Sequence, residues 1–151
     1  MRDKRFIAEH RGGLLKKEQH RQLIQWSCDC VEHVLPLFGD ISDERLENAI
    51  RVAKKWARGE ATVGDARKAS LQAIAAARES SSAIAIAAAR SVGHAVATAH
   101  MADHSLGAAL YALKAVKNAG KSIDAEREWQ NEQLPPEIME LVLSARSKKE
   151  K

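Results

Sequence analysis

Alanine constrains the fold of this chain more than any other residue. The 151 residues include 27 alanines, but only 2 Phe, 3 Trp and 1 Tyr. Alanine has the highest helix propensity, whereas the strand-favouring residues Val, Ile and Thr together number 19. This balance predicts an all-α protein and excludes an all-β fold. Because few side chains are large, the helix axes should pack at the near end of the usual range of about 8 to 10 Å.

Apolar periodicity and capping residues divide the chain into six or seven helices. The predicted segments are 17 to 35, 43 to about 58 behind the N-cap Ser42, 63 to 79 behind a Thr62–Asp65 capping box, 82 to at most 102, 104 to 119 behind the N-cap Asp103, 122 to 130 and 137 to 145. Their short connections predict a compact bundle of mostly antiparallel helices with a single core. The large side chains that we expect to be mostly buried there are Trp26, Trp56, Leu110 and Leu113.

The length predicts one domain spanning residues 1 to 151, folded from about residue 9 to 145. The net charge of +4 comes from the ends: residues 1 to 25 carry 7 basic and 3 acidic side chains, residues 145 to 151 carry 4 and 1, and the body carries 13 and 16. We expect both basic ends to be frayed and solvated, which argues against a nucleic-acid partner. The absence of a long apolar run or a signal-peptide pattern predicts a cytoplasmic protein without a membrane partner.

Two patterns in the sequence are interpreted as structural. Cys28 and Cys30 would point about 200° apart on a helix, so both thiols are expected to be free. The hexapeptide AIAAAR occurs at 73 to 78 and again at 85 to 90. This spacing is too short for a solenoid unit, so we interpret the repeat as alanine-rich low complexity on two helices separated by the intervening serines.

A histidine cluster is the strongest candidate for a functional site. His100 and His104 would share one face of a continuous helix, with Asp103 beside them, and His94 would join them if the chain bends. The cluster could fill a tight helix interface, bind a partner or ligand, or serve metal binding or acid–base chemistry, with His100 and His104 as the metal alternative. For the first role, which we favour, His104→Ala should cost about 1 to 3 kcal/mol of stability while leaving partner binding intact.

A second candidate lies near the N-terminus. His10, Arg11 and the following glycines, Gly12 and Gly13, could form a small anion nest, although a docking turn leading into the first helix is the alternative that we favour. No phosphate-loop pattern and no serine-nucleophile turn occur in the sequence. We therefore expect no catalytic residues, no enzymatic activity and no cofactor.

Several strings resemble the immunity-protein family of bacterial polymorphic toxin systems, a group of small alanine-rich helical proteins. They are EHRGGLLKKEQHRQLIQWSCDCVEHVLPLF, AIRVAKKWARGE, GHAVATAHMADHSLGAALYALKA and EREWQNEQLP. The similarity spans residues 9 to 143, and its most specific part is 94 to 115, with three histidines, an aspartate and a glycine. No site residue is carried over from this family.

The resemblance implies a stoichiometric inhibitor. A rigid helical body would bind a toxin effector and occlude its active site or block a required motion, without turnover. The alternative is a small-ligand or metal-binding helical protein that uses His94, His100, Asp103 and His104. The partner expected from the resemblance is a protein, and a homo-oligomer is also compatible with the sequence.

Overall fold

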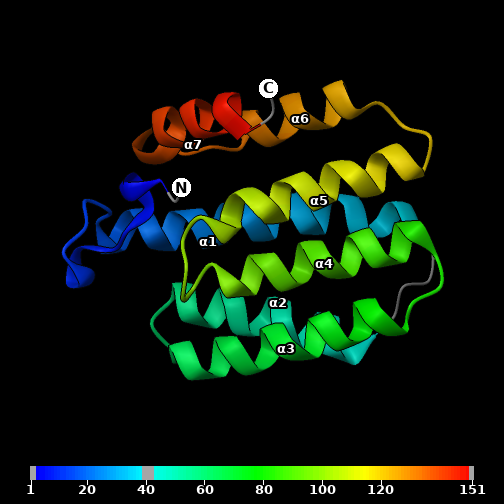
Figure 1. Ribbon diagram of the computed structural model, residues 1–151, viewed down its shortest axis with the longest axis horizontal. Helices are drawn as coiled ribbons and strands as arrows, with labels where there is room; N and C mark the ends of the chain where they lie inside the picture. Colours follow the sequence, from blue (N-terminus) through cyan, green and yellow to red (C-terminus); the bar gives the residue numbers. More distant parts are fainter. Residues whose placement is uncertain (1–2, 39–42, 150–151) are drawn as a thin grey trace.

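The computed structural model describes residues 3–38 and 43–149, and every element longer than an isolated bridge in this part of the chain is a helix (Figure 1). Seven α-helices are present there: α1 (Lys17–Val34), α2 (Glu44–Ala57), α3 (Val63–Glu79), α4 (Ala83–Ala97), α5 (His104–Asn118), α6 (Ile123–Glu132) and α7 (Pro136–Lys149). Three short 3-10 helices cover Lys4–Phe6, Glu9–Arg11 and Leu35–Phe38. The predicted all-α bundle is confirmed. None of the described helices combines the length and apolar content needed to span a bilayer.

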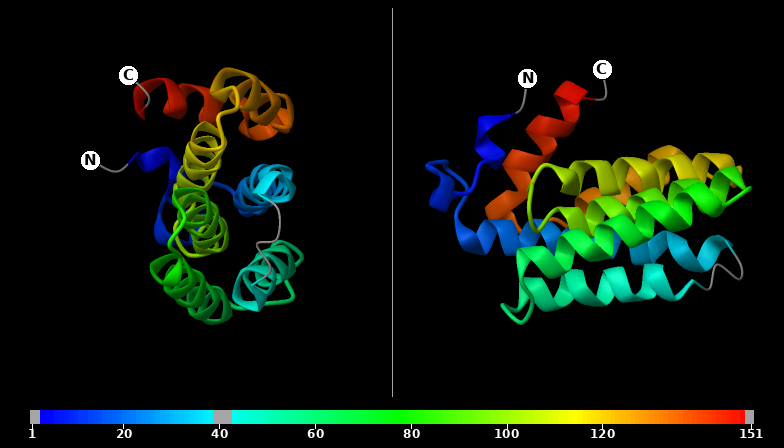
Figure 2. Two further views of the ribbon diagram at one scale, coloured as in Figure 1. Left: turned by 90° about the vertical axis from the view of Figure 1, so that its right-hand side faces the viewer. Right: turned by 60° about the horizontal axis from the view of Figure 1, so that its bottom comes forward.

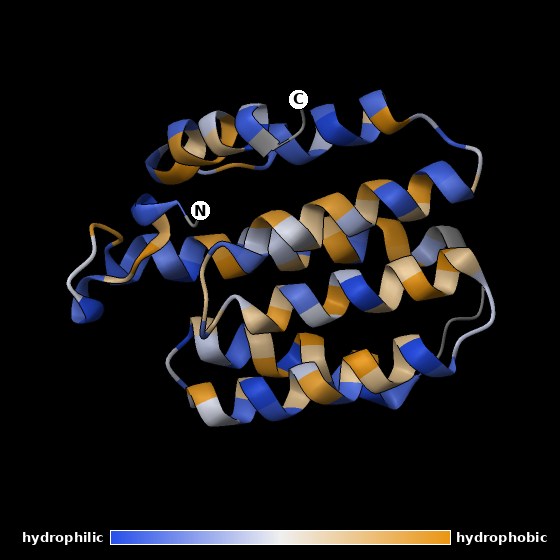
Figure 3. Ribbon diagram, in the orientation of Figure 1, coloured by the Kyte–Doolittle hydropathy of each residue, from blue (hydrophilic) through white to orange (hydrophobic). Residues whose placement is uncertain are grey.

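The central position in the bundle belongs to α4, which packs against α1, α2, α3 and α5. Seen along the helix axes, α2 and α3 lie at one end of the molecule and α6 and α7 at the other, with α1, α4 and α5 between them (Figure 2). Coloured by hydropathy, α4 carries long apolar stretches, whereas α6 is hydrophilic beyond its first turn (Figure 3). An apolar helix thus occupies the centre of the packing and polar helices lie outside it.

Local side-chain chemistry sets most helix boundaries. The predicted capping box is present, since Thr62 Oγ1 accepts from the Asp65 amide at 3.0 Å and Asp65 accepts from the Thr62 amide at 3.0 Å. Two predicted caps need correction. Asp43 caps α2 by accepting from the Arg45 amide at 2.9 Å, and Ser42 lies outside the described residues. Asp103 precedes α5 in helical geometry, and its side chain makes no capping bond.

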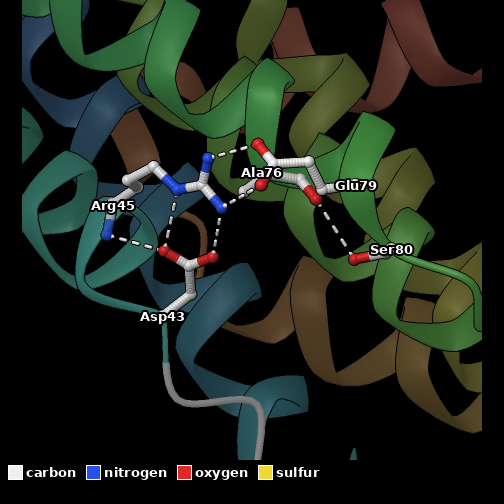
Figure 4. Close-up of polar contacts among 5 residues, drawn as sticks. All are labelled: Asp43, Arg45, Ala76, Glu79 and Ser80. Atoms are coloured by element: carbon white, nitrogen blue, oxygen red, sulfur yellow. Dashed lines mark hydrogen bonds and ion pairs between the residues drawn. The ribbon is translucent and has the colours of Figure 1, made fainter.

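Arg45 ties the first turn of α2 to the last turn of α3 (Figure 4). Its guanidinium donates to Asp43 Oδ2 at 2.9 Å and to Glu79 Oε2 at 2.6 Å. Both carboxylates have lowered pKa values, chiefly because they accept hydrogen bonds from this guanidinium. The Glu79 carboxylate is therefore turned toward α2 and its charge is offset there.

Buried apolar side chains fall into two main clusters, a division that the sequence pattern does not predict. The alanine cluster joins α1 to α2, α3, α4 and α5, and most of its members are alanines, among them Ala53, Ala73 and Ala95. The large-residue cluster joins α1 to α5, α7 and the N-terminal segment, and its main side chains are Phe6, Leu15, Leu23, Trp26, Leu106, Leu134, Ile138 and Val142. One face of α1 contributes to each cluster: Cys28 to the first and Cys30 to the second.

The burial predictions are only partly correct. Trp26 and Leu113 are buried, with 1% and 3% of their surface exposed. Trp56 is half-buried at the edge of the alanine cluster. The prediction that Leu110 is buried is wrong, because this residue remains 39% exposed. The face of α5 that is buried contains Ala108, Ala109 and Ala112 instead.

The segments 3 to 8 and 146 to 149, which we expected to be frayed, both have residues packed against the rest of the described chain. Phe6 belongs to the large-residue cluster and is 1% exposed. At the other end α7 continues to Lys149, because Arg146 is buried and its guanidinium donates to Gln130 Oε1 at 2.7 Å and to Asn131 Oδ1 at 3.0 Å. A basic residue at this end thus anchors α7 to α6.

Candidate functional site

The connection between α4 and α5 brings two of the predicted histidines face to face. α4 ends at Ala97 and α5 begins at His104, so His100 and His104 do not lie on one continuous helix. Thr98 Oγ1 helps to end α4 by donating to the His94 carbonyl at 3.0 Å. Because the chain reverses here, Nδ1 of His94 and Nδ1 of His104 come within 2.9 Å. His94 therefore joins His104 through a reversal of the chain between two helices, not through a bend within one helix.

Gly107 makes room for this pair. A Cβ atom at Gly107 would lie 2.6 Å from His94 Nδ1 and 2.9 Å from its Cγ, closer than such atoms approach one another in real proteins. The His94 ring consequently lies against the backbone of α5. Its ring also stacks on Tyr111, with centroids 5.2 Å apart and ring planes inclined by 19°. The small residue and the aromatic residue of α5 together fix the orientation of His94.

The contact between the two rings limits their charge. A hydrogen bond between two Nδ1 atoms requires one nitrogen to carry the proton and the other to accept it. An imidazolium carries protons on both ring nitrogens, so two charged rings cannot make this contact. The pair therefore holds at most one positive charge while the contact persists, and it can offer hydrogen bonds to a neighbouring group through Nε2.

A groove of about 270 Å³ runs beside this pair, between α3, α4 and α5. Its cationic lining comes from Arg78 at the end of α3 and Arg90 on α4. Tyr111 forms part of the wall, with the Arg90 guanidinium 5.8 Å and the Lys114 ammonium 4.7 Å from its ring centroid. Apart from Tyr111, the uncharged lining is Ser70, Ile74, Ala77, Gly93 and Ala97, with His94 and His104 completing the wall. No carboxylate of the described chain lines this groove.

Arg78 and Arg90 are not among the site residues predicted from the sequence, although the AIAAAR repeat marks both of them. They are the last residues of the two AIAAAR copies, and the antiparallel packing of α3 and α4 brings both copies to one groove. The repeat is therefore more than low complexity. Two identical alanine-rich turns, each ending in arginine, allow the helices to approach closely while placing both guanidiniums at one surface.

The other predicted residues gather elsewhere. His100 lines a separate hollow of about 50 Å³ together with His10, Arg11, His20 and Trp56. Burial lowers the pKa of His100, and the positive charge of Arg67 lowers it further. Asp103 lines neither hollow. Five of the six predicted site residues thus divide between two hollows, with His94 and His104 at the groove and His100, His10 and Arg11 at the smaller hollow. The two groups remain in contact, because the His100 ring stacks on the His104 ring with centroids 6.1 Å apart and ring planes inclined by 28°.

The backbone geometry at Gly12 and Gly13 agrees with the docking turn that we favoured over an anion nest. The Gly12 amide donates to the Glu9 carbonyl and the Gly13 amide to the Ala8 carbonyl, both at 3.0 Å. A side chain at Gly13 would collide with the Ile7 carbonyl, whose oxygen lies 1.9 Å from the position of a Cβ atom. Because both amides already have backbone partners, neither is left to bind an anion.

The groove offers two guanidiniums and a histidine pair, which are hydrogen-bond donors suited to an anion. In the described residues, no three His, Cys, Asp or Glu side chains are grouped so that they could hold a metal ion. Both cysteines are free, as predicted, and buried. Burial raises the pKa of Cys28 to about 12 and also raises that of Cys30, so neither thiol is activated as a nucleophile.

Comparison with known proteins identifies one family. The family model described as Imm-5 like putative immunity protein matches residues 13–137. No curated protein and no solved structure matches this chain. The matched residues include α1 through α6, Gly107 and the two groove arginines, Arg78 and Arg90. Because it covers most of the chain, the protein belongs to the Imm-5-like immunity-protein family.

Proposed function

We propose that this protein neutralises a toxin effector by binding it stoichiometrically. The observation that carries the proposal is the family match over residues 13–137. A tightly packed helical body supports it physically, because a rigid surface loses little conformational entropy when a partner binds. Inhibition by occlusion requires no turnover, in keeping with the absence of a catalytic arrangement from the site described above.

The surface that we assign to the toxin is the face around the groove, with His94 and His104 as partner-binding residues. Exposed apolar side chains flank it on α3 and α5: Leu71 is 68% exposed, Ile74 37% and Leu110 39%. Apolar side chains beside fixed polar groups are typical of the central part of protein interfaces. We assign the hollow around His10, Arg11 and His100 a structural role, because it is small and joins the N-terminal segment to α1 and α2.

The alternative, a small-ligand or metal site built from His94, His100, Asp103 and His104, has less support. His100 stacks on His104 but lines the smaller hollow instead of the groove, and Asp103 lines neither. A metal centre would need three or four of these groups to converge.

The test is reconstitution with a toxin. The product of the neighbouring gene is produced with this protein, and the complex is analysed by size-exclusion chromatography with light scattering and by titration of toxin activity. We expect a 1:1 complex and an activity that falls linearly to zero at one equivalent. A toxin that keeps its activity at a large excess of this protein would contradict the proposal for that pair. If this protein consumed the substrate of the toxin when no toxin was present, it would be an enzyme instead of an inhibitor.

A further inference from the structure

The groove between α3, α4 and α5 is cationic, although the body of the chain between its basic ends carries 16 acidic and only 13 basic side chains. Arg78 and Arg90 both line it. In the described parts of the chain, neither guanidinium has a carboxylate within ion-pair distance. The carboxylate next to Arg78 in sequence, Glu79, is held by Arg45 on the side of α2 (Figure 4). The charge of Arg78 is thus directed to the groove without a local counter-ion.

Tyr111 positions the second cation. The Arg90 guanidinium lies 5.8 Å from the Tyr111 ring centroid, within the range of a cation–π contact, and His94 stacks on the same tyrosine. A guanidinium held against an aromatic ring keeps its planar set of N–H donors available at the edge. That geometry suits a carboxylate, which accepts two parallel hydrogen bonds from an arginine.

The surroundings of the groove favour a side chain of a protein partner as the occupant. Its volume of about 270 Å³ is close to the lower end of the range of about 300 to 1,000 Å³ typical of small-molecule sites. Ile74, Ala77 and Ala97 provide an apolar wall, which would remove water from a carboxylate and strengthen its attraction to the two guanidiniums. Leu71 and Leu110 outside the groove offer further contact area to a larger partner.

We propose that this groove receives the carboxylate of an Asp or Glu side chain from an acidic segment of a protein partner, with Arg78 and Arg90 as the binding cations. The identity of that partner as the toxin rests on the proposed function. The binding chemistry does not, because it follows from the charge, shape and volume of the groove.

The first experiment tests the groove without the toxin. An oligoglutamate peptide is added to the isotope-labelled protein at millimolar concentration, with oligoglutamine as the neutral match, and amide and histidine-ring NMR signals are followed. We expect shifts at the groove residues with oligoglutamate only, and their loss in the double variant Arg78→Gln, Arg90→Gln. The matched control is Arg51→Gln, Lys117→Gln, which removes the same charge from exposed residues outside the groove and should keep the shifts.

Three results would overturn the proposal: no groove shifts with oligoglutamate, equal shifts with oligoglutamine, or unchanged shifts in the groove variant. Displacement of the peptide by inorganic phosphate or an oligonucleotide at lower concentration would also overturn it, because the site would then be one for phosphate. Thermal melts of both double variants show whether each is folded. A groove variant that unfolds is replaced by Arg90→Lys, which keeps the charge but loses the bidentate geometry and should weaken the shifts.

The second experiment uses the toxin and separates this proposal from the proposed function. The groove variant should bind the toxin about tenfold or more weakly, and the control variant should bind as the parent does. A parent that binds the peptide in the groove but not the toxin would contradict the proposed function and leave the anion site standing. A groove variant that binds the toxin as tightly as the parent would overturn the assignment of the acidic segment to the toxin.

Discussion

The two sides of α1 pack against their neighbours with side chains of opposite size. On one side the alanine cluster brings α2, α3 and α4 together through methyl groups, and on the other side the large-residue cluster fills the space before α7 with Trp26, Phe6 and several leucines. Each alanine removes little apolar area from water, so the alanine cluster depends on close approach along whole helices. The large-residue cluster depends on a few side chains that each remove a large area. The first region should therefore be sensitive to added volume and the second to lost volume.

The largest expected effect is the removal of the central side chain of the large-residue cluster. Trp26→Ala should reduce the free energy of unfolding by about 3 to 5 kcal/mol, because a cavity replaces a fully buried ring. Its indole nitrogen also donates to the Gln130 carbonyl at 2.8 Å, and the Arg146 guanidinium lies 5.8 Å from the ring. Urea denaturation followed by circular dichroism measures the loss. Leu14→Ala, at a residue that is 77% exposed, is the control and should change little.

Next comes added volume in the alanine cluster. Ala73→Leu should cost about 1 to 3 kcal/mol, because the extra atoms would force α3 away from α4. Ala73 is fully buried, and its Cβ lies 3.7 Å from the position that a Cβ on Gly93 would take. The exposed Ala125, changed to Leu, is the matched control. If Ala73→Leu were as stable as the parent, the close packing inferred for this region would be contradicted.

The histidine pair tests whether the groove wall supports the alanine region. We expect His104→Ala to lower the free energy of unfolding by about 1 kcal/mol, since His94 would lose a hydrogen-bond partner at a half-buried position. The structure places the pair both against Gly107 and beside the groove. Measuring toxin affinity on the same variant separates the two roles. An unchanged melting temperature combined with weaker binding would make His104 a binding residue instead of a structural one.

The smallest expected effect is a loss of stability at acidic pH that comes from His20. His20 is buried between the N-terminal segment, Trp56 and the turn after α4, where its ring nitrogen donates to the Thr98 carbonyl. Burial lowers its pKa below the ordinary 6.5. The unfolded chain then binds a proton more readily than the folded one, so the stability from neutral His20 is complete above pH 6.5 and declines as the pH falls toward the lowered folded pKa. Denaturation curves over this interval should show the decline, and His20→Gln should reduce it.

Helices and their caps could be predicted from the sequence because their causes are local. Alanine content and the Thr62–Asp65 pair act within one or two turns, and α3 begins and ends where predicted. Which face of α5 is covered depends on neighbours far away in sequence, so periodicity placed Leu110 in the core wrongly. The groove could not be predicted for the same reason: Arg78 and Arg90 meet only because α3 and α4 run antiparallel at one register. Similarly, His100 and His104 line different hollows because of elements that are distant in sequence: the N-terminal segment, α1 and α2 pack around His100, and α3 packs beside His104.

The placement of Cys28 and Cys30 on opposite faces of α1 provides two built-in reporters of local opening. Each thiol is fully buried in a different cluster, and burial keeps its pKa high, so alkylation must wait until the surrounding structure opens. If the two clusters unfold as one cooperative unit, both thiols are modified with the same protection. If the large-residue side can detach while α1 to α4 stay together, Cys30 is modified first. Two thiols within one turn of a single helix thus record whether this small bundle is one cooperative unit or two.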